Sequence, residues 1–171
     1  FNFAYMIKRG EDGNRRPPDR APKLLAAYEE VVQHLACPVF IGGKSMGGRM
    51  ASMLLAENAM KDEKERLPIR GAACLGFPFH AVGKEPKDRL DHLKDLVAPL
   101  LIVQGSRDTM GTQEEVLEYL KEERINASIK IRWLEDGNHD LKPRKVSGFT
   151  HQEHINSAIE QVTDYVLALN K

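Results

Sequence analysis

The residues most suited to chemistry lie in a glycine-rich stretch, FIGGKSMGGRM, at positions 40–50. Two kinds of site use such a stretch. One is a phosphate-binding loop that ends in Gly-Lys-Ser, and the other is a sharp turn that displays a nucleophilic serine. The phosphate loop requires the pattern G-x-x-x-x-G-K-[ST], which would place a glycine at position 38. That position is Pro38, and apolar residues follow it at 39–41, so the sequence disfavours a phosphate loop.

The serine turn fits better, because Gly43-Lys44-Ser45-Met46-Gly47 matches G-x-S-x-G between a strand-like run and a helix-like run. In such a site an acid and then a histidine follow the serine along the chain, each just beyond a strand. Asp108 follows the apolar run PLLIVQG, and His139 follows the alternating run IKIRWL. The order and the placement predict a Ser45–Asp108–His139 triad.

The residue types suit acyl transfer. A serine hydroxyl is a weak nucleophile at neutral pH until a base such as His139 accepts its proton. Asp108 would fix the histidine tautomer and stabilise the imidazolium. The backbone N–H of Met46, at the start of a helix, is predicted to donate to the oxyanion, with Gly43 and Gly47 allowing the turn to close.

Strands and helices are predicted to alternate, which is typical of an α/β fold with a mostly parallel sheet and helices on both faces. Thr112 with Glu115, and Thr150 with Glu153, have the spacing of helix-starting capping boxes. Strands are expected at 1–7, 38–43, 69–79, 99–108 and from 127 onward, and helices at 23–35, 45–63 and 112–124, within 80–98 and after 150.

Three motifs, GGKSMGGR, GSRDTMG and GNHDLKP, together resemble the α/β-hydrolase superfamily. More narrowly, the chain resembles the small dienelactone-hydrolase-like group of bacterial hydrolases, which is also similar to testis-expressed protein 30. The resemblance covers essentially the whole chain and implies a serine hydrolase that needs no metal and no organic cofactor. Dienelactone hydrolases proper use a cysteine where this chain has Ser45, so their substrate does not carry over.

The resemblance also implies strands and a helix upstream of FNFAYM, including a central strand whose loop usually carries the second oxyanion donor. Residues 1–171 contain none of these, so we expect a single domain that is N-terminally incomplete. Only about 20 residues separate the strands at 69–79 and 99–108, which leaves no room for a large cap domain.

Loop residues at the strand ends are the predicted substrate contacts, with His80 as a pocket-wall residue or a rival histidine. Asp136 and Asp140 flank His139 and are rival acids on the wrong strand end. The rival functions are an acyltransferase, which uses the same triad, and a non-catalytic protein-interaction module on the same fold. The predicted substrate-binding residues are Tyr5, Met6, Phe77, Phe79, His80, Met110 and Leu141.

The composition argues against some classes of binding partner. Lys+Arg and Asp+Glu are equal at 25 each, so no excess charge points to nucleic acid or an anionic membrane surface. No apolar run approaches the ~20 residues that span a bilayer, and no signal peptide is evident. Cys37 and Cys74 lie in apolar surroundings and are expected to be buried free thiols. We therefore expect a cytoplasmic protein with a small-molecule ester substrate; its oligomeric state is not predicted.

Overall fold

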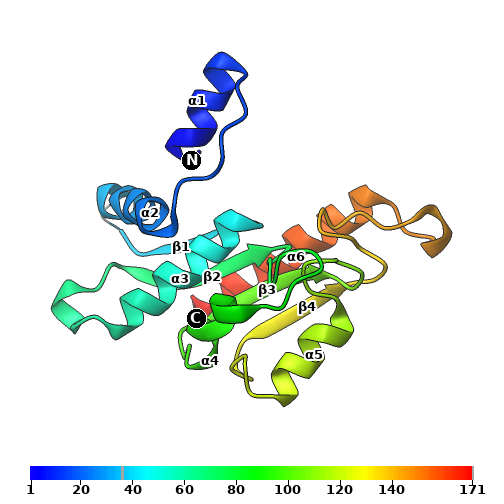
Figure 1. Cartoon of the computed structure of the whole chain (residues 1–171). Helices are drawn as coiled ribbons and strands as arrows, with labels where there is room; N and C mark the ends of the chain where they lie inside the picture. The colour runs from blue at the N-terminus through cyan, green and yellow to red at the C-terminus, as the bar shows by residue number, and fades with distance from the viewer. Residues whose placement is uncertain (36, 171) are drawn as a thin grey trace.

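The computed structural model describes residues 1–35 and 37–170, and within them helices alternate with the strands of one sheet (Figure 1). The neighbouring strands are all parallel, in the order β1-β2-β3-β4. This confirms the predicted α/β class and its parallel sheet. The strands are β1 Val39–Lys44, β2 Ile69–Leu75, β3 Leu100–Gly105 and β4 Lys130–Leu134.

The helices begin close to the predicted positions, and both capping boxes form. Thr112 Oγ1 accepts from the Glu115 N–H at 3.3 Å, and Thr150 Oγ1 accepts from the Glu153 N–H at 3.2 Å. The α-helices are α1 Ala4–Asp12, α2 Ala21–Leu35, α3 Met46–Met60, α4 Asp91–Lys94, α5 Gln113–Lys121 and α6 His151–Leu169, and the 3-10 helices are η1 Glu63–Glu65, η2 Lys87–Leu90 and η3 Lys145–Ser147.

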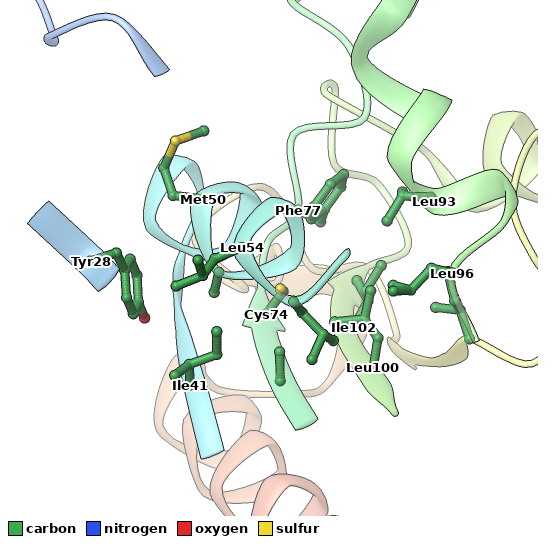
Figure 2. Close-up of a cluster of buried hydrophobic side chains, with 14 of the residues drawn as sticks. Tyr28, Ile41, Met50, Leu54, Cys74, Phe77, Leu93, Leu96, Leu100 and Ile102 are labelled. Carbon is green, nitrogen blue, oxygen red and sulfur yellow. The ribbon is translucent and has the colours of Figure 1, made fainter. Parts of the chain in front are cut away.

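The sheet carries a hydrophobic cluster on each face, because side chains along β3 point alternately to opposite sides. Leu100 and Ile102 belong to the larger cluster, in which Leu54 of α3 lies over the sheet (Figure 2). Leu101 and Val103 belong to the second cluster, which α6 covers with Ala158 and Tyr165. Burying a side chain such as Leu54 stabilises the fold by roughly 1.5–3 kcal/mol, so the two clusters fix the sheet between its helices.

The predicted strand at 1–7 is wrong, since α1 begins at Ala4. A strand needs a neighbour for its backbone N–H and C=O groups, whereas a helix satisfies them internally. At the outer edge of β1, the backbone of Gly42 forms hydrogen bonds with Tyr28 and not with another strand. The Tyr28 hydroxyl donates to the Gly42 carbonyl at 2.5 Å and accepts from the Gly42 N–H at 3.1 Å. Phe3 is buried against the Tyr28 ring at a centroid distance of 6.3 Å. Phe3 is therefore covered by aromatic packing and not by sheet pairing.

The two cysteines differ. Cys74 is fully buried, its thiol contacts the Gly48 carbonyl oxygen at 3.1 Å, and burial raises its pKa far above the ordinary value, which makes it unreactive. Cys37 is exposed, so the expectation that it is buried is wrong. Both are free thiols.

The predicted site residues lie at the carboxyl ends of the strands. β2 and β3 end at Leu75 and Gly105, earlier than the sequence suggested. Ser45, Asp108 and His139 follow the carboxyl ends of β1, β3 and β4 respectively. Because parallel strands end at the same edge of a sheet, the three residues approach one another there.

Candidate active site

Ser45 occupies a tight turn between β1 and α3. Its backbone has φ 53° and ψ −119°, outside the regions that side-chain-bearing residues prefer, and its N–H donates to the Leu75 carbonyl at 2.9 Å. A Cβ on Gly43 would lie 2.7 Å from the Gly47 carbonyl carbon, and one on Gly48 would lie 2.6 Å from the Gly43 oxygen. A Cβ on Gly47 would meet no neighbouring atom within 4 Å. The turn therefore requires Gly43 and Gly48, and the predicted steric need for Gly47 is not supported.

A continuous chain of hydrogen bonds joins the three predicted triad residues. Ser45 Oγ lies 2.8 Å from His139 Nε2, and His139 Nδ1 lies 2.8 Å from Asp108 Oδ2. Because the carboxylate accepts a hydrogen bond from Nδ1–H, the neutral ring presents the Nε2 lone pair to the serine hydroxyl. This arrangement gives Ser45 an adjacent base and gives His139 an orienting acid.

The carboxylate of Asp108 is fully buried, whereas the side chain of His139 is 25% exposed. Asp108 Oδ2 also accepts from Gln104 Nε2 at 2.8 Å, and Oδ1 accepts from the Met110 N–H at 2.8 Å. These donors satisfy a charge that would otherwise be costly to bury. Gln104 was not among the residues predicted from the sequence; the available signal was a polar residue inside the apolar run PLLIVQG.

An apolar groove of about 680 Å³ leads to Ser45 along the outer edge of β1. Its walls come from the N-terminal residues, α2 and β1, and Ser45 and Met46 lie within its lining. The volume is in the range of small-molecule sites. Two predicted substrate contacts, Tyr5 and Met6, line this groove together with Ser45.

Comparison with known proteins identifies the family. The model of the alpha/beta hydrolase domain family matches residues 1–167. The chain belongs to the α/β-hydrolase domain family. This agrees with the motif resemblance at the superfamily level, while the narrower dienelactone-hydrolase-like grouping stays a prediction.

Solved structures with the hydrolase fold are similar to this chain at low sequence identity. An alpha-beta serine hydrolase homologue from Coxiella burnetii is 16% identical with a TM-score of 0.60, over 91% of this chain and 65% of that chain. A monoacylglycerol lipase from Paleococcus ferrophilus is 11% identical with a TM-score of 0.63, over 89% and 78%. An esterase domain from a Rhodothermus marinus protein is 14% identical with a TM-score of 0.50, over 71% and 60%. The chain thus spans about two thirds of the length of the Coxiella structure.

The rival acids of this hydrolase domain have other partners. Asp136 is held by Arg144 and Arg107, and hydrogen bonds from the Arg144 side chain and backbone lower its pKa to about 2. Asp140 pairs with Lys44 at 2.6 Å, and that hydrogen bond lowers the pKa of its carboxyl. The carboxylate that faces the ring of His139 is therefore that of Asp108.

The rival histidine, His80, lies away from the serine in this hydrolase domain. Its Nδ1 is 3.0 Å from the Ala81 carbonyl oxygen, and its Nε2 is 3.3 Å from Glu115 Oε2. The ring is buried with a side-chain exposure of 5%. It braces the loop after β2 against α5 and makes no contact with Ser45 among the described hydrogen bonds.

Several predicted substrate contacts are buried in the core. Phe77 and Phe79 are fully buried and pack edge to face at 4.8 Å, because the chain turns inward directly after β2. Leu141 joins the α6 cluster, and His80 is buried as described above. These four side chains have little or no exposed surface in this conformation, and their contact with substrate stays a prediction. Met110 is half-buried next to Asp108 and remains a candidate contact.

Residues 1–35 and 37–170 contain no group of three His, Cys, Asp or Glu side chains that could hold a metal ion. No helix there combines the length and the apolar character needed to cross a bilayer.

Proposed function

We propose that this chain is a serine hydrolase that cleaves a carboxylic ester or thioester through an acyl-enzyme, with Ser45, His139 and Asp108 as its catalytic triad. The single observation that carries the proposal is the unbroken hydrogen-bond chain from Ser45 Oγ through the His139 ring to Asp108. A non-catalytic scaffold would have no need for a strained serine facing an oriented base.

The geometry supports a two-step reaction. Ser45 Oγ attacks the carbonyl carbon while His139 Nε2 takes the hydroxyl proton, and the imidazolium is stabilised by the buried Asp108 carboxylate. The histidine then returns the proton to the departing alcohol or thiol, leaving an ester on Ser45. Water then attacks the ester while His139 accepts its proton, and the histidine passes that proton to Ser45 Oγ as the acid leaves, which restores the serine.

Met46 is the proposed oxyanion donor. As the first residue of α3, its N–H is among those that have no carbonyl partner within the helix. The positive end of the helix dipole lies at the same point and favours a developing negative charge. The oxygen of the tetrahedral intermediate would therefore be stabilised directly beside the attacking serine.

The groove beside Ser45 favours an apolar acyl group, since Phe1, Phe3 and Tyr28 are among its walls. Only η2 and α4 lie between β2 and β3, which supports a single domain with an open site and no large cap. The dienelactone-hydrolase-like grouping is part of the proposal. So is a cytoplasmic location, which the two free thiols support.

The test is turnover of nitrophenyl esters and acyl thioesters of increasing chain length. We expect an initial burst of product and an acyl adduct on the peptide containing Ser45, with both absent in Ser45→Ala and His139→Ala. Transfer to an added alcohol at the expense of hydrolysis would favour the acyltransferase. Absence of turnover and of adduct with every ester and thioester would favour the interaction module.

A further inference from the structure

Gln104 is a fully buried polar side chain near the end of β3. Its amide joins three segments. It exchanges two hydrogen bonds with the backbone of Phe77 in the loop after β2, at 2.7 Å to the N–H and 3.2 Å to the carbonyl. It also donates to Asp108 Oδ2 at 2.8 Å and to the Gly111 carbonyl at 3.2 Å.

The surroundings accept the amide in one orientation only. Oε1 must face the Phe77 N–H, because that group is a donor. Nε2 must face the carboxylate and two carbonyl oxygens, all of which are acceptors. Rotating the amide by 180° would set a donor against a donor and oxygen against oxygen. The site therefore requires an acceptor and a donor on one side chain.

The donor matters because the charge of Asp108 is balanced by hydrogen bonds alone. Its oxygens accept from Gln104, the Met110 N–H and His139. Among the ion pairs of residues 1–35 and 37–170, its partner is His139, and no Lys or Arg pairs with it. A buried carboxylate stays ionised only where donors replace its lost hydration.

We propose that Gln104 is a positioning residue that hydrogen-bonds the buried carboxylate of Asp108 and aims its Oδ2 at His139. Oδ2 is the oxygen that both Gln104 Nε2 and His139 Nδ1 address, so the amide sets where the imidazole points. Gln104 touches neither substrate nor serine and acts through Asp108. The inference rests on the proposed function of the triad.

Two variants distinguish the effect of the Gln104 hydrogen-bond donor from the effect of its side-chain volume. Gln104→Met keeps a similar volume and supplies no donor. Gln104→Glu keeps the acceptor for the Phe77 N–H and replaces the donor with a group that donates only while protonated. We expect Gln104→Met to lower the rate at which a fluorophosphonate labels Ser45 by about 10- to 100-fold, the value of a hydrogen bond to a charged group.

Gln104→Glu should change the pH dependence as well as the rate. The protonated side chain donates to Asp108 as the amide does, but above the pH at which that proton leaves, two carboxylates face each other. The variant should therefore lose labelling on the alkaline side, where the unaltered protein stays active. A uniform decrease at every pH, or labelling by Gln104→Met within about twofold of the unaltered protein, would overturn the proposal.

Asn58→Asp is the matched control. Asn58 is also a buried amide; it bonds both backbone groups of Leu67, far from the triad residues in sequence and on the opposite end of α3 from Ser45. The same amide-to-acid change there should lower stability without adding an alkaline loss of labelling. Circular dichroism at each pH establishes that the compared variants are folded.

A second readout needs no catalysis. The proton on His139 Nδ1, held against the carboxylate, should give a low-field resonance in proton spectra that disappears in His139→Ala. Gln104→Met should shift or broaden that resonance, and an unchanged resonance would contradict the positioning role. If the unaltered protein fails to label while the resonance responds to Gln104, the proposed function fails and the positioning of Asp108 stands.

Discussion

Ser45 has a strained backbone conformation. Its φ of 53° lies in a region that costs on the order of 1–3 kcal/mol for a residue with a side chain. The strain persists because Gly43 and Gly48 close around the turn, where a Cβ would meet backbone atoms. The sequence motif predicted this turn, because G-x-S-x-G between a strand and a helix is the pattern of a nucleophile elbow.

The two glycines on either side of Ser45 should respond differently to alanine. Gly43→Ala places a Cβ 2.7 Å from the Gly47 backbone, so we expect a loss of about 1–3 kcal/mol in unfolding free energy and slower labelling of Ser45. Gly47→Ala meets open space, and its unfolding free energy should change by less than ~1 kcal/mol. Urea denaturation of both variants checks this; equal losses would contradict the proposed packing of the turn.

His92 should make the protein less stable in mild acid. Burial, aided by the positive charge of Arg49, lowers its pKa from 6.5 to about 4, and its Nε2 lies 2.9 Å from Ser52 Oγ. The unfolded chain binds the proton first, so stability present above pH 6.5 is lost as pH falls toward 4, by up to roughly 3 kcal/mol.

Denaturation midpoints at pH 7 and pH 5 measure this effect. His92→Gln keeps an amide donor for Ser52 and does not titrate, so the pH 5 deficit should shrink. The exposed His34 provides the control, since His34→Gln should leave the deficit unchanged. A deficit that survives in His92→Gln would assign the acid sensitivity to other groups.

At the scale of elements, the loop between β4 and α6 must hold His139 at a fixed height above the sheet. Asp136 adopts φ 56° and its carboxylate is 8% exposed. It accepts from the Arg144 backbone and side chain and from Arg107 Nε, while its own N–H donates to Ser106 Oγ at 2.8 Å. The parts of the loop on either side of His139 are thereby tied to each other and to the loop after β3.

Asp136→Asn should loosen this loop and slow the labelling of Ser45, because the amide cannot accept both arginine side chains as a carboxylate does. Asparagine tolerates the positive φ at position 136, so the substitution should not strain the backbone. Asp140→Asn is the control. Its pair with Lys44 is exposed, 48% for Lys44 and 67% for Asp140, and is expected to contribute less than ~1 kcal/mol. Equal labelling by both variants would contradict the bracing role of Asp136.

The same loop should respond to strong acid. The depressed pKa of Asp136 means that its stabilising contribution is present above about pH 4 and lost as pH falls through about 2. Amide exchange at residues 137–144, compared at pH 4 and pH 2.5 after correction for the intrinsic rate, should rise more there than in α6. An equal rise in amide exchange in residues 137–144 and in α6 would contradict the stabilising role of Asp136.

The sequence predicted an element well where its formation depends on residues close together in the chain. Thr112 and Thr150 start α5 and α6 as their capping boxes indicated, since a cap depends on residues within one turn. Residues 1–7 were misread because a strand depends on a partner that the sequence does not display. Phe77 and Phe79 were predicted to contact substrate because they follow the end of β2 at Leu75. Their full burial depends on packing against other elements, which the sequence does not display.

At the scale of the whole molecule, the site lies where three strand ends and an apolar groove meet. The hydrogen-bonded arrangement of Ser45, His139 and Asp108 could be predicted because each residue has a motif of its own. Gln104 could not, since its role arises from segments 27 residues apart in sequence that only the folded sheet brings together. The groove also depends on how the N-terminal residues pack on α2 and β1.

The groove predicts a dependence on acyl length. Met6 lines it at 43% exposure, so Met6→Ser should raise KM for long acyl esters more than for acetate, while kcat changes little. Met60, at the far end of α3 and 88% exposed, gives the matched control, and Met60→Ser should leave KM unchanged for all esters. An equal KM increase for short and long esters in Met6→Ser would place acyl binding elsewhere.

Covalent labelling of the folded chain with a fluorophosphonate, followed by mass spectrometry of its peptides, tests directly whether His139 activates Ser45. We expect one adduct, on Ser45, that is lost in Ser45→Ala and in His139→Ala while both variants remain folded. An unlabelled Ser45 in the folded protein, or labelling that persists in His139→Ala, would contradict a serine activated by His139.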